Sequence, residues 1–325
     1  MNSKANRTAL VTGATSGLGF EAALHLADEG FGRVIITGRD TTKAATAAAE
    51  LTKRANKDIF ESLALDLNDS HDVGRAVTEL TDRQVSIDFL LLNAGMVSGS
   101  KQVKTPEGIE ITYASSLIGH HQLTMGVLAN DLLATNARIV IAGSEAARGD
   151  VPTFNPVDLS EHARKHFDSD LITAATALIR GEGPGKFPPG NTYATAKLFV
   201  AWWASSLSRM LPEGTTVTAV SPGSAPGTSA GRNANFFMKR IMMPVMKHAP
   251  ARLRMAASVP DAARRYIDAA DFTDQVSGQF FASAPKKMTG PLHRVELAHV
   301  LDRASEDAAW AATVAAAGVG YPVAA

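Results

Sequence analysis

The sequence predicts an α/β fold, in which parallel strands form a sheet and helices connect them. Two observations lead to this prediction. Short runs of β-branched and other apolar residues alternate along the chain with longer stretches of helical pattern, as in βαβ units with right-handed crossovers. The runs are also apolar on both faces, which is typical of parallel strands covered by helices on both sides.

The expected elements follow from this alternation in chain order. We expect strands over residues 9–12, 33–37, 62–66, 88–93, 138–142, 216–220 and 279–282. We expect helices over residues 17–29, 42–55, 70–82, 107–133, 193–211 and 261–270. A helix between consecutive strands lets those strands lie parallel to each other.

Three segments lie outside the alternation. Residues 145–192 form a connection much longer than the usual link between a strand and a helix, with a helix expected at 170–180, and such a connection is usually functional or disordered. Residues 224–260 form a lobe beyond the sixth strand, and residues 303–325 form an Ala-rich helix with a loose end. We place all of them in a single domain over residues 1–325.

The composition excludes several classes of function. The 325 residues hold 32 Lys and Arg against 32 Asp and Glu, whereas a nucleic-acid-binding protein usually needs a basic face. The chain has no cysteine, which excludes disulfides and thiol nucleophiles and fits a reducing compartment. The sequence lacks both the apolar region of a secretory signal and a run of about 18–20 apolar residues. We therefore expect a cytoplasmic protein with no membrane span and no nucleic-acid partner.

A glycine-rich loop follows the first expected strand. Its glycines stand at positions 13, 17 and 19, where the strand ends and a helix begins. Glycine lets the backbone turn tightly and approach a diphosphate, and the helix N-terminus supplies free N–H groups and partial positive charge. A plain turn is the alternative. We expect cofactor contacts at Gly13, Thr15, Ser16, Gly17, Leu18 and Gly19.

The end of the second strand favours NADP over NAD. NAD-selective sites place an acid near this point to bind the adenosine ribose. Here Gly38 leaves space, and Arg39 offers a planar cation that suits a 2′-phosphate. The alternative is a solvated arginine.

A candidate acid–base group lies on the helix expected from residue 193. Tyr193 and Lys197 are four residues apart and share one helix face. The lysine ammonium is expected to lower the tyrosine pKa, which allows proton exchange with a carbonyl or alcohol oxygen. Ser144 closes the fifth strand and can hold the same oxygen. The alternative is a core tyrosine beside a surface lysine.

Taken together, these motifs resemble the short-chain dehydrogenase/reductase family. Besides the residues above, the resemblance rests on Asp66-Leu67, Asn93-Ala94-Gly95, the Tyr193-Ala-Thr-Ala-Lys197 motif and Pro222-Gly223, and it covers roughly residues 7–285. The ordered set is more specific than any single motif. The resemblance implies a doubly wound (Rossmann) domain with a seven-stranded parallel sheet.

The resemblance also implies roles for individual residues. It implies adenine contacts at Asp66 and Leu67, a cofactor-facing turn at Asn93, Ala94 and Gly95, and nicotinamide contacts near Pro222, Gly223 and Thr228. It implies that Tyr193 is the general acid/base, that Lys197 tunes it and holds the nicotinamide ribose, and that Ser144 orients the substrate. Ser116 stands where the family usually has an asparagine that holds a water in a proton relay.

The long connection before Tyr193 resembles that of the monomeric carbonyl reductases of this family. The retinol-dehydrogenase-like branch is similar through Glu107-Gly108-Ile109-Glu110 and Gly119-His120. Both resemblances imply lipophilic ketones or aldehydes, and the lobe agrees, because methionine adapts to varied ligand shapes. Its alternative is an amphipathic helix on the core. The lobe residues are Phe236, Phe237, Met238, Met242, Met243 and Met246. Monomer and homodimer both stay open.

The histidine and tryptophan pairs in the sequence are weaker functional signals. His162 and His166 have metal-ligand spacing, but a solvated helix face explains them better, so we predict no metal. Core packing is the preferred interpretation of Trp202 and Trp203, and His120 and His121 are interpreted as structural.

The sequence therefore predicts an NADP(H)-dependent oxidoreductase that interconverts a carbonyl and an alcohol on a lipophilic small molecule. Two alternatives remain. One is reduction of a conjugated C=C bond, and the other is a dinucleotide-binding sensor or scaffold with weak catalysis because of Ser116.

Overall fold

The computed structural model describes residues 6–99, 101–183, 189–225 and 257–322. Thr228 and the apolar residues expected to form the lobe, 236–246, lie outside the described residues.

A single sheet organises the described chain, with strand order β3-β2-β1-β4-β5-β6-β7-β8. The pairings from β3 through β7 are parallel, so the predicted doubly wound α/β fold is confirmed. The sheet has eight strands instead of the predicted seven, because β8 adds an antiparallel edge. The strands are β1 Thr8–Val11, β2 Arg33–Gly38, β3 Phe60–Ala64, β4 Ile87–Leu92, β5 Leu133–Ala142, β6 Thr216–Val220, β7 Phe280–Ala282 and β8 His293–Arg294.

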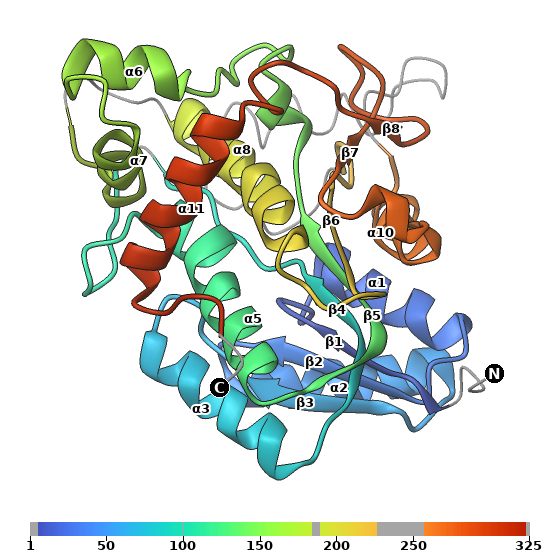
Figure 1. Ribbon diagram of the computed structural model, residues 1–325. Helices are drawn as coiled ribbons and strands as arrows, with labels where there is room; N and C mark the ends of the chain where they lie inside the picture. The colour runs from blue at the N-terminus through green and yellow to red at the C-terminus, as the bar shows by residue number, and fades with distance from the viewer. Residues whose placement is uncertain (1–5, 100, 184–188, 226–256, 323–325) are drawn as a thin grey trace.

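Helices cover both faces of the sheet (Figure 1). On one face, α1, α2 and α10 pack over one hydrophobic cluster, and on the other, α3, α5 and α8 pack over a second. The principal helices are α1 Gly17–Asp28, α2 Thr41–Ala55, α3 Ser70–Asp82, α4 Ile111–Tyr113, α5 Gly119–Ala129, α6 Leu159–His166, α7 Leu171–Arg180, α8 Pro189–Ser208, α10 Val259–Asp268 and α11 Arg303–Ala317.

The helix expected over residues 107–133 is wrong at both ends and in its middle. It begins only at α4, where the Glu110 carboxylate accepts hydrogen bonds from the N–H groups of Thr112 and Tyr113. A π-helical turn, Ala114–Ile118, separates α4 from α5. The last expected residue, Leu133, already belongs to β5. Helical periodicity does not reveal a π turn, because it adds only one residue to the helix.

The described part of the long connection before α8 contains two α-helices. The expected helix at 170–180 is confirmed as α7, which Asp170 caps through the N–H groups of Ile172 and Thr173. The eight-residue α6 was expected only as a solvated helix face around His162 and His166, since a segment this short has little periodicity, and the solvation is wrong for His162, which is buried. The expected C-terminal helix is confirmed as α11, and it packs against both α7 and α8.

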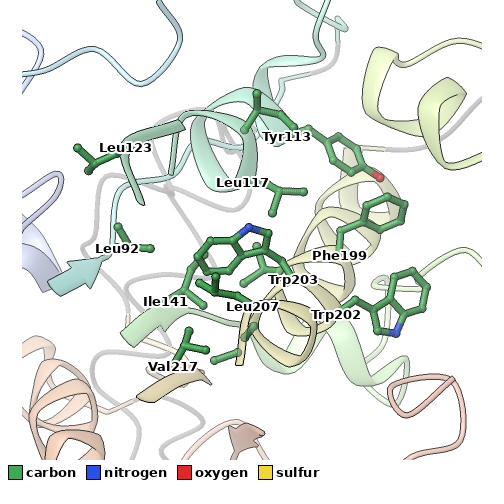
Figure 2. Packing of buried hydrophobic residues seen from close by; sticks show 14 of the residues in the cluster. Leu92, Tyr113, Leu117, Leu123, Ile141, Phe199, Trp202, Trp203, Leu207 and Val217 are labelled. Atoms are coloured by element: carbon green, nitrogen blue, oxygen red, sulfur yellow. The ribbon is translucent and has the colours of Figure 1, made fainter. Parts of the chain in front are cut away.

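The core beneath α8 holds the two neighbouring tryptophans, so the prediction of core packing is confirmed. Figure 2 shows Trp202 and Trp203 pointing in different directions from α8. Trp202 donates to the His299 carbonyl at 3.1 Å, and Trp203 donates to Nδ1 of His121 at 3.0 Å. His121 Nε2 lies 2.8 Å from the Val319 carbonyl, and burial lowers the pKa of His121 to about 4. His121 is thus a neutral bridge between α8 and the segment after α11.

Candidate active site

The glycine-rich loop connects β1 to α1 along a path that side chains would block. Gly13 and Gly17 both have left-handed φ angles, of +65° and +64°. A Cβ on Gly13 would lie 2.9 Å from Ala94 Cα, and one on Gly19 would lie 2.6 Å from Asn93 Nδ2. Glycine is therefore required both by the turn and by the close packing of the loop on the chain after β4.

A cavity of about 220 Å³ opens at this loop, along the carboxyl ends of β1 to β4. It brings together eleven of the residues predicted to bind a cofactor. They are Gly13, Thr15, Ser16, Gly17, Leu18, Arg39, Asp66, Leu67, Asn93, Ala94 and Gly95. Gly19 does not line the cavity, because it packs behind the loop. The place of the cavity agrees with the rule that open α/β sheets bind ligands where the strand order reverses.

The end of β2 forms the outer wall of this cavity. The expectation that Gly38 leaves space is wrong, because a Cβ at this position would collide with the Thr15 methyl group, which already fills that space. Arg39 is exposed, and its guanidinium lies 3.8 Å from Met96 Sδ. Arg39 is the only cation among the described residues that line the cavity.

The turn after β4 is tied to the loop by side-chain hydrogen bonds. Asn93 Nδ2 donates to the carbonyls of Thr12 and Gly13 at 2.9 and 3.3 Å. The N–H of Ala94 donates to the Thr12 hydroxyl at 3.0 Å. The inner wall of the cavity is thereby fixed to the glycine-rich loop.

His120 extends this connection to the π-helical turn. Its Nδ1 lies 3.2 Å from the Ser116 carbonyl, and its Nε2 lies 2.9 Å from the Thr12 hydroxyl. A carbonyl only accepts, so Nδ1 carries the proton and Nε2 accepts from Thr12. Burial lowers the pKa of His120 to about 3, so the ring stays neutral. The sequence analysis interpreted His120 as structural and did not reveal that it connects Thr12 to Ser116. Only the Gly119-His120 pair of the family resemblance pointed to this residue.

Ser144, Tyr193 and Lys197 meet at the end of β5. The hydroxyl of Ser144 accepts from the N–H of Ala146 at 3.2 Å and lies close enough to the Tyr193 phenol to lower its pKa. Lys197 follows one turn later on α8 and donates from Nζ to the Ala142 carbonyl at 2.7 Å. Tyr193 is partly exposed, whereas Lys197 is buried.

The prediction that Lys197 lowers the pKa of Tyr193 is wrong for the protein without a bound cofactor, because that pKa is raised and Lys197 is not among its causes. Desolvation raises the pKa of Tyr193, the nearby Ser144 hydroxyl opposes that rise, and the charge of Glu145 adds to it. The Lys197 ammonium lies 5.8 Å from the Tyr193 ring centroid and is engaged by the Ala142 carbonyl. Burial also lowers the pKa of Lys197 itself to about 8. Tyr193 is therefore a phenol, not a phenolate, at neutral pH.

Ser116 lies in the π-helical turn beside this group. It is buried, and its hydroxyl has no hydrogen-bond partner among the described residues. The hydroxyl would lie 3.1 Å from a Cβ built on Gly95, and Lys197 Nζ would lie 3.9 Å from the same point. A buried hydroxyl without a partner is costly, and such a group suits a bound water.

The residues predicted at the catalytic end do not line the cavity, and the turn after β6 and the histidine pair on α6 also lie outside it. Pro222 and Gly223 follow β6, the neighbour of β5, and Gly223 has a left-handed φ of +81°. His162 and His166 pack ring against ring on α6, with centroids 5.1 Å apart. Within the described ranges, no group of three or more His, Cys, Asp or Glu side chains could hold a metal ion. No helix in those ranges is both long and apolar enough to cross a bilayer.

Comparison with known proteins agrees with this geometry. The family described as short chain dehydrogenase matches residues 7–172. The WW domain-containing oxidoreductase of Drosophila melanogaster is 28% identical over 85% of this chain, which spans 61% of that relative's length. Human retinol dehydrogenase 13 is 25% identical over 88% of this chain and 78% of its own length.

A solved structure shows the same fold. A short chain dehydrogenase from Burkholderia cenocepacia, in complex with NADP, superimposes with a TM-score of 0.58 at 21% identity, over 84% of this chain and 94% of that one. The family match covers just over half of the chain, and the strand order, the glycine-rich loop and the cavity agree with it. This chain is therefore an oxidoreductase that belongs to the short chain dehydrogenase family.

Proposed function

We propose that the protein is an NADP(H)-dependent oxidoreductase that interconverts a carbonyl and an alcohol on a lipophilic small molecule. The observation that carries the proposal is the meeting of three predicted catalytic side chains at the end of β5, where Ser144 lies close enough to Tyr193 to lower the pKa of its phenol. A buried ammonium, Lys197, lies one helical turn away, and its Nζ would lie 3.9 Å from a Cβ built on Gly95, which lines the cavity. An oxygen held between the serine and the tyrosine would meet both a hydrogen-bond donor and a proton source.

The cavity residues fit a dinucleotide. Close packing at Gly13 and Gly19 leaves the backbone of the loop exposed to a diphosphate, at the N-terminus of α1. Asp66 and Leu67 border the adenine end, and Arg39 would pair with a 2′-phosphate. The NADP complex of the Burkholderia relative supports this choice of cofactor. When bound, the reduced nicotinamide supplies a hydride.

Tyr193 acts as the acid in the reducing direction. Its raised pKa keeps the phenol protonated, so it can give a proton to a developing alkoxide. The Ser144 hydroxyl holds the same oxygen, and Lys197 remains mostly charged at pH 7 because its pKa is about 8. Lys197 also faces the nicotinamide ribose in this proposal. A water bound to the Ser116 hydroxyl would pass a proton toward Lys197.

The surroundings of Tyr193 support an apolar substrate. The Phe154 ring packs edge-on against Tyr193 with centroids 6.0 Å apart, and both side chains are partly exposed. The similarity to retinol dehydrogenase 13 points in the same direction. Because α11 packs on α8, and α7 packs on α11, α8 is covered where it would otherwise be free for pairing, which favours a monomer over a homodimer. The single domain over 1–325 and the cytoplasmic location stay predictions from the sequence.

A sensor with weak catalysis is the second candidate, and Ser116 favours it. Serine is shorter than the asparagine of the family pattern and lacks an amide, so it holds a relay water less well. The raised pKa of Tyr193 would also slow the oxidising direction. Reduction of a conjugated C=C bond uses the same tyrosine and lysine and stays a third possibility.

Titration of NADPH fluorescence followed by a substrate panel tests the proposal. The panel contains ketones, aldehydes, enones and secondary alcohols, half of them with long apolar chains. We expect saturable NADPH binding and oxidation of NADPH by the apolar ketones or aldehydes. Binding without turnover of any compound would instead support the sensor. Saturation of enones without carbonyl reduction would support the C=C reductase.

A further inference from the structure

A buried carboxylate next to Ser144 has no role in the proposed chemistry. Glu145 is only 1% exposed and starts the short helix Glu145–Arg148 directly after β5. Its carboxylate accepts from the Ser221 hydroxyl, and from the N–H and hydroxyl of Ser283 at 3.2 and 2.9 Å. A buried carboxylate held by neutral donors alone would be costly, so it needs a cation.

Arg265 of α10 supplies that cation. Its Nη1 lies 3.3 Å from Glu145 Oε1 and donates to the Ser221 carbonyl at 3.1 Å. Its Nη2 donates to the Ser283 hydroxyl at 2.9 Å and to the Gly290 carbonyl. The planar guanidinium thus joins the chain after β5, the chain after β6 and the chain after β7.

Arg148 holds the same region from the other end of the short helix. It is 4% exposed, and its Nη1 donates to the carbonyls of Ser283 and Ala284. Its Nη2 donates to the Lys287 carbonyl at 2.8 Å. We call Glu145, Arg148 and Arg265 the buried clamp, because together they fix the loop of residues 283–290.

The loop in turn fixes the turn after β6. The N–H of Ser224 donates to the Met288 carbonyl at 2.8 Å, and that of Gly223 donates to the Ser221 hydroxyl at 3.2 Å. A Cβ on Gly223 would lie 2.8 Å from the Met288 carbonyl and 2.9 Å from Arg265 Nη1. The turn over residues 221–224 therefore has little freedom to move away from the clamp.

The position of the turn over residues 221–224 suggests what the buried clamp does for catalysis. This inference rests on the proposed function. The cavity along β1 to β4 takes the adenosine and diphosphate end of the dinucleotide, and the substrate oxygen lies at Ser144 and Tyr193. The hydride-donating ring must then lie near the ends of β5 and β6, beside residues 221–224. We propose that Glu145 and Arg265 are positioning residues, which hold this turn against Ser144 and so align the nicotinamide end with the substrate oxygen.

The electrostatic arrangement supports the same assignment. The Glu145 charge acts on the Tyr193 phenol and raises its pKa, and Arg265 balances that charge. Loss of one partner would leave the other charged, buried and close to the reacting group.

Glu145→Gln tests the proposal against a matched control, Glu306→Gln. Glu306 is also a buried carboxylate that accepts from a serine and an arginine, Ser205 and Arg209, each at 3.0 Å, but it lies on α11. The measurements are the melting temperature, kcat and KM with an active substrate from the panel, and the affinities for NADPH and for adenosine 2′,5′-bisphosphate. The bisphosphate lacks the nicotinamide end, so the ratio of the two affinities reports on that end alone.

We expect both variants to melt at lower temperature, and only Glu145→Gln to lose function. Its kcat should fall by about tenfold to hundredfold, because small misplacement of reacting groups is enough for such a loss. KM should change less, NADPH should bind about fivefold more weakly, and the bisphosphate should bind as to the wild type. Arg265→Lys, which keeps the charge but not the planar guanidinium, should show smaller changes in the same quantities. It replaces Glu145→Gln as the test variant if Glu145→Gln does not fold.

Equal behaviour of Glu145→Gln and Glu306→Gln would overturn the proposal, as would equal weakening of NADPH and bisphosphate binding. A wild-type protein that binds both ligands but turns over no compound would overturn only the proposed function. The affinity ratio would then still decide the role of the clamp.

Discussion

The two ends of the candidate site are built by different means. Along β1 to β4, backbone and mostly small side chains surround an open cavity, in which Gly13, Gly38 and Asn93 set the shape. At the ends of β5 to β7, charged side chains are buried and bind one another or backbone carbonyls, as Lys197 and Glu145 do. The comparison indicates that backbone geometry sets the shape of the nucleotide end, whereas interactions of buried charged side chains set the arrangement of the catalytic end.

Tyr193→Phe gives the largest effect that we expect and separates the two ends. Removal of the phenol hydroxyl removes the proton source, so kcat should fall by about 10²- to 10⁴-fold. The affinity for NADPH should stay within twofold by fluorescence titration, because Tyr193 does not line the cavity.

Tyr113→Phe is the matched control for this substitution. Tyr113 is a buried tyrosine whose hydroxyl has no partner among the described residues, and it packs edge-on against Phe199 (Figure 2). Tyr113→Phe should leave kcat unchanged. It should raise the free energy of unfolding by about 1 kcal/mol, because it removes a buried hydroxyl that has no partner among the described residues. An active Tyr193→Phe enzyme would show that the catalytic acid lies elsewhere.

Lys197→Met should remove a pH dependence of stability. Burial lowers the pKa of Lys197 from 10.5 to about 8, so between these values the unfolded chain binds a proton that the folded protein does not. The free energy of unfolding should therefore rise with pH in this window, by up to about 3 kcal/mol. Urea unfolding of wild type and variant at pH 7.5 and 10 measures the difference. Equal pH slopes for the two proteins would mean that Lys197 is charged and well solvated in the fold.

Arg39→Asp acts at the other end of the site. A charge-assisted hydrogen bond to a phosphate contributes about 1.5–3 kcal/mol, so KM for NADPH should rise about tenfold to hundredfold. The same variant assayed with NADH is the internal control, and its KM should change little. A similar rise for both cofactors would contradict the selection of NADP by this arginine.

The difference between the two ends also explains what could be predicted from the sequence. The glycine spacing and the apolar strands are local signals, and the strand over 216–220 and the helix over 70–82 were predicted to the residue. The π-helical turn and the two-residue β8 have no periodicity of their own. Glu145 and Arg265 are 120 residues apart and resemble ordinary surface charges in the sequence. Their pairing, like the pKa of Tyr193, depends on burial that only the packed structure reveals.

Ser116→Asn should give the smallest change in kcat, and it tests whether a water bound at this position takes part in proton transfer at the catalytic end. The buried hydroxyl of Ser116 has no partner among the described residues, and it faces the space beside Gly95 and Lys197. An asparagine amide would offer both a donor and an acceptor to a water there, so kcat should stay unchanged or rise up to about threefold. Ser116→Ala, which removes the water ligand, should lower kcat without lowering the melting temperature. If Ser116→Ala kept full activity, the proton of Tyr193 would have to be replenished by a route that does not pass through residue 116.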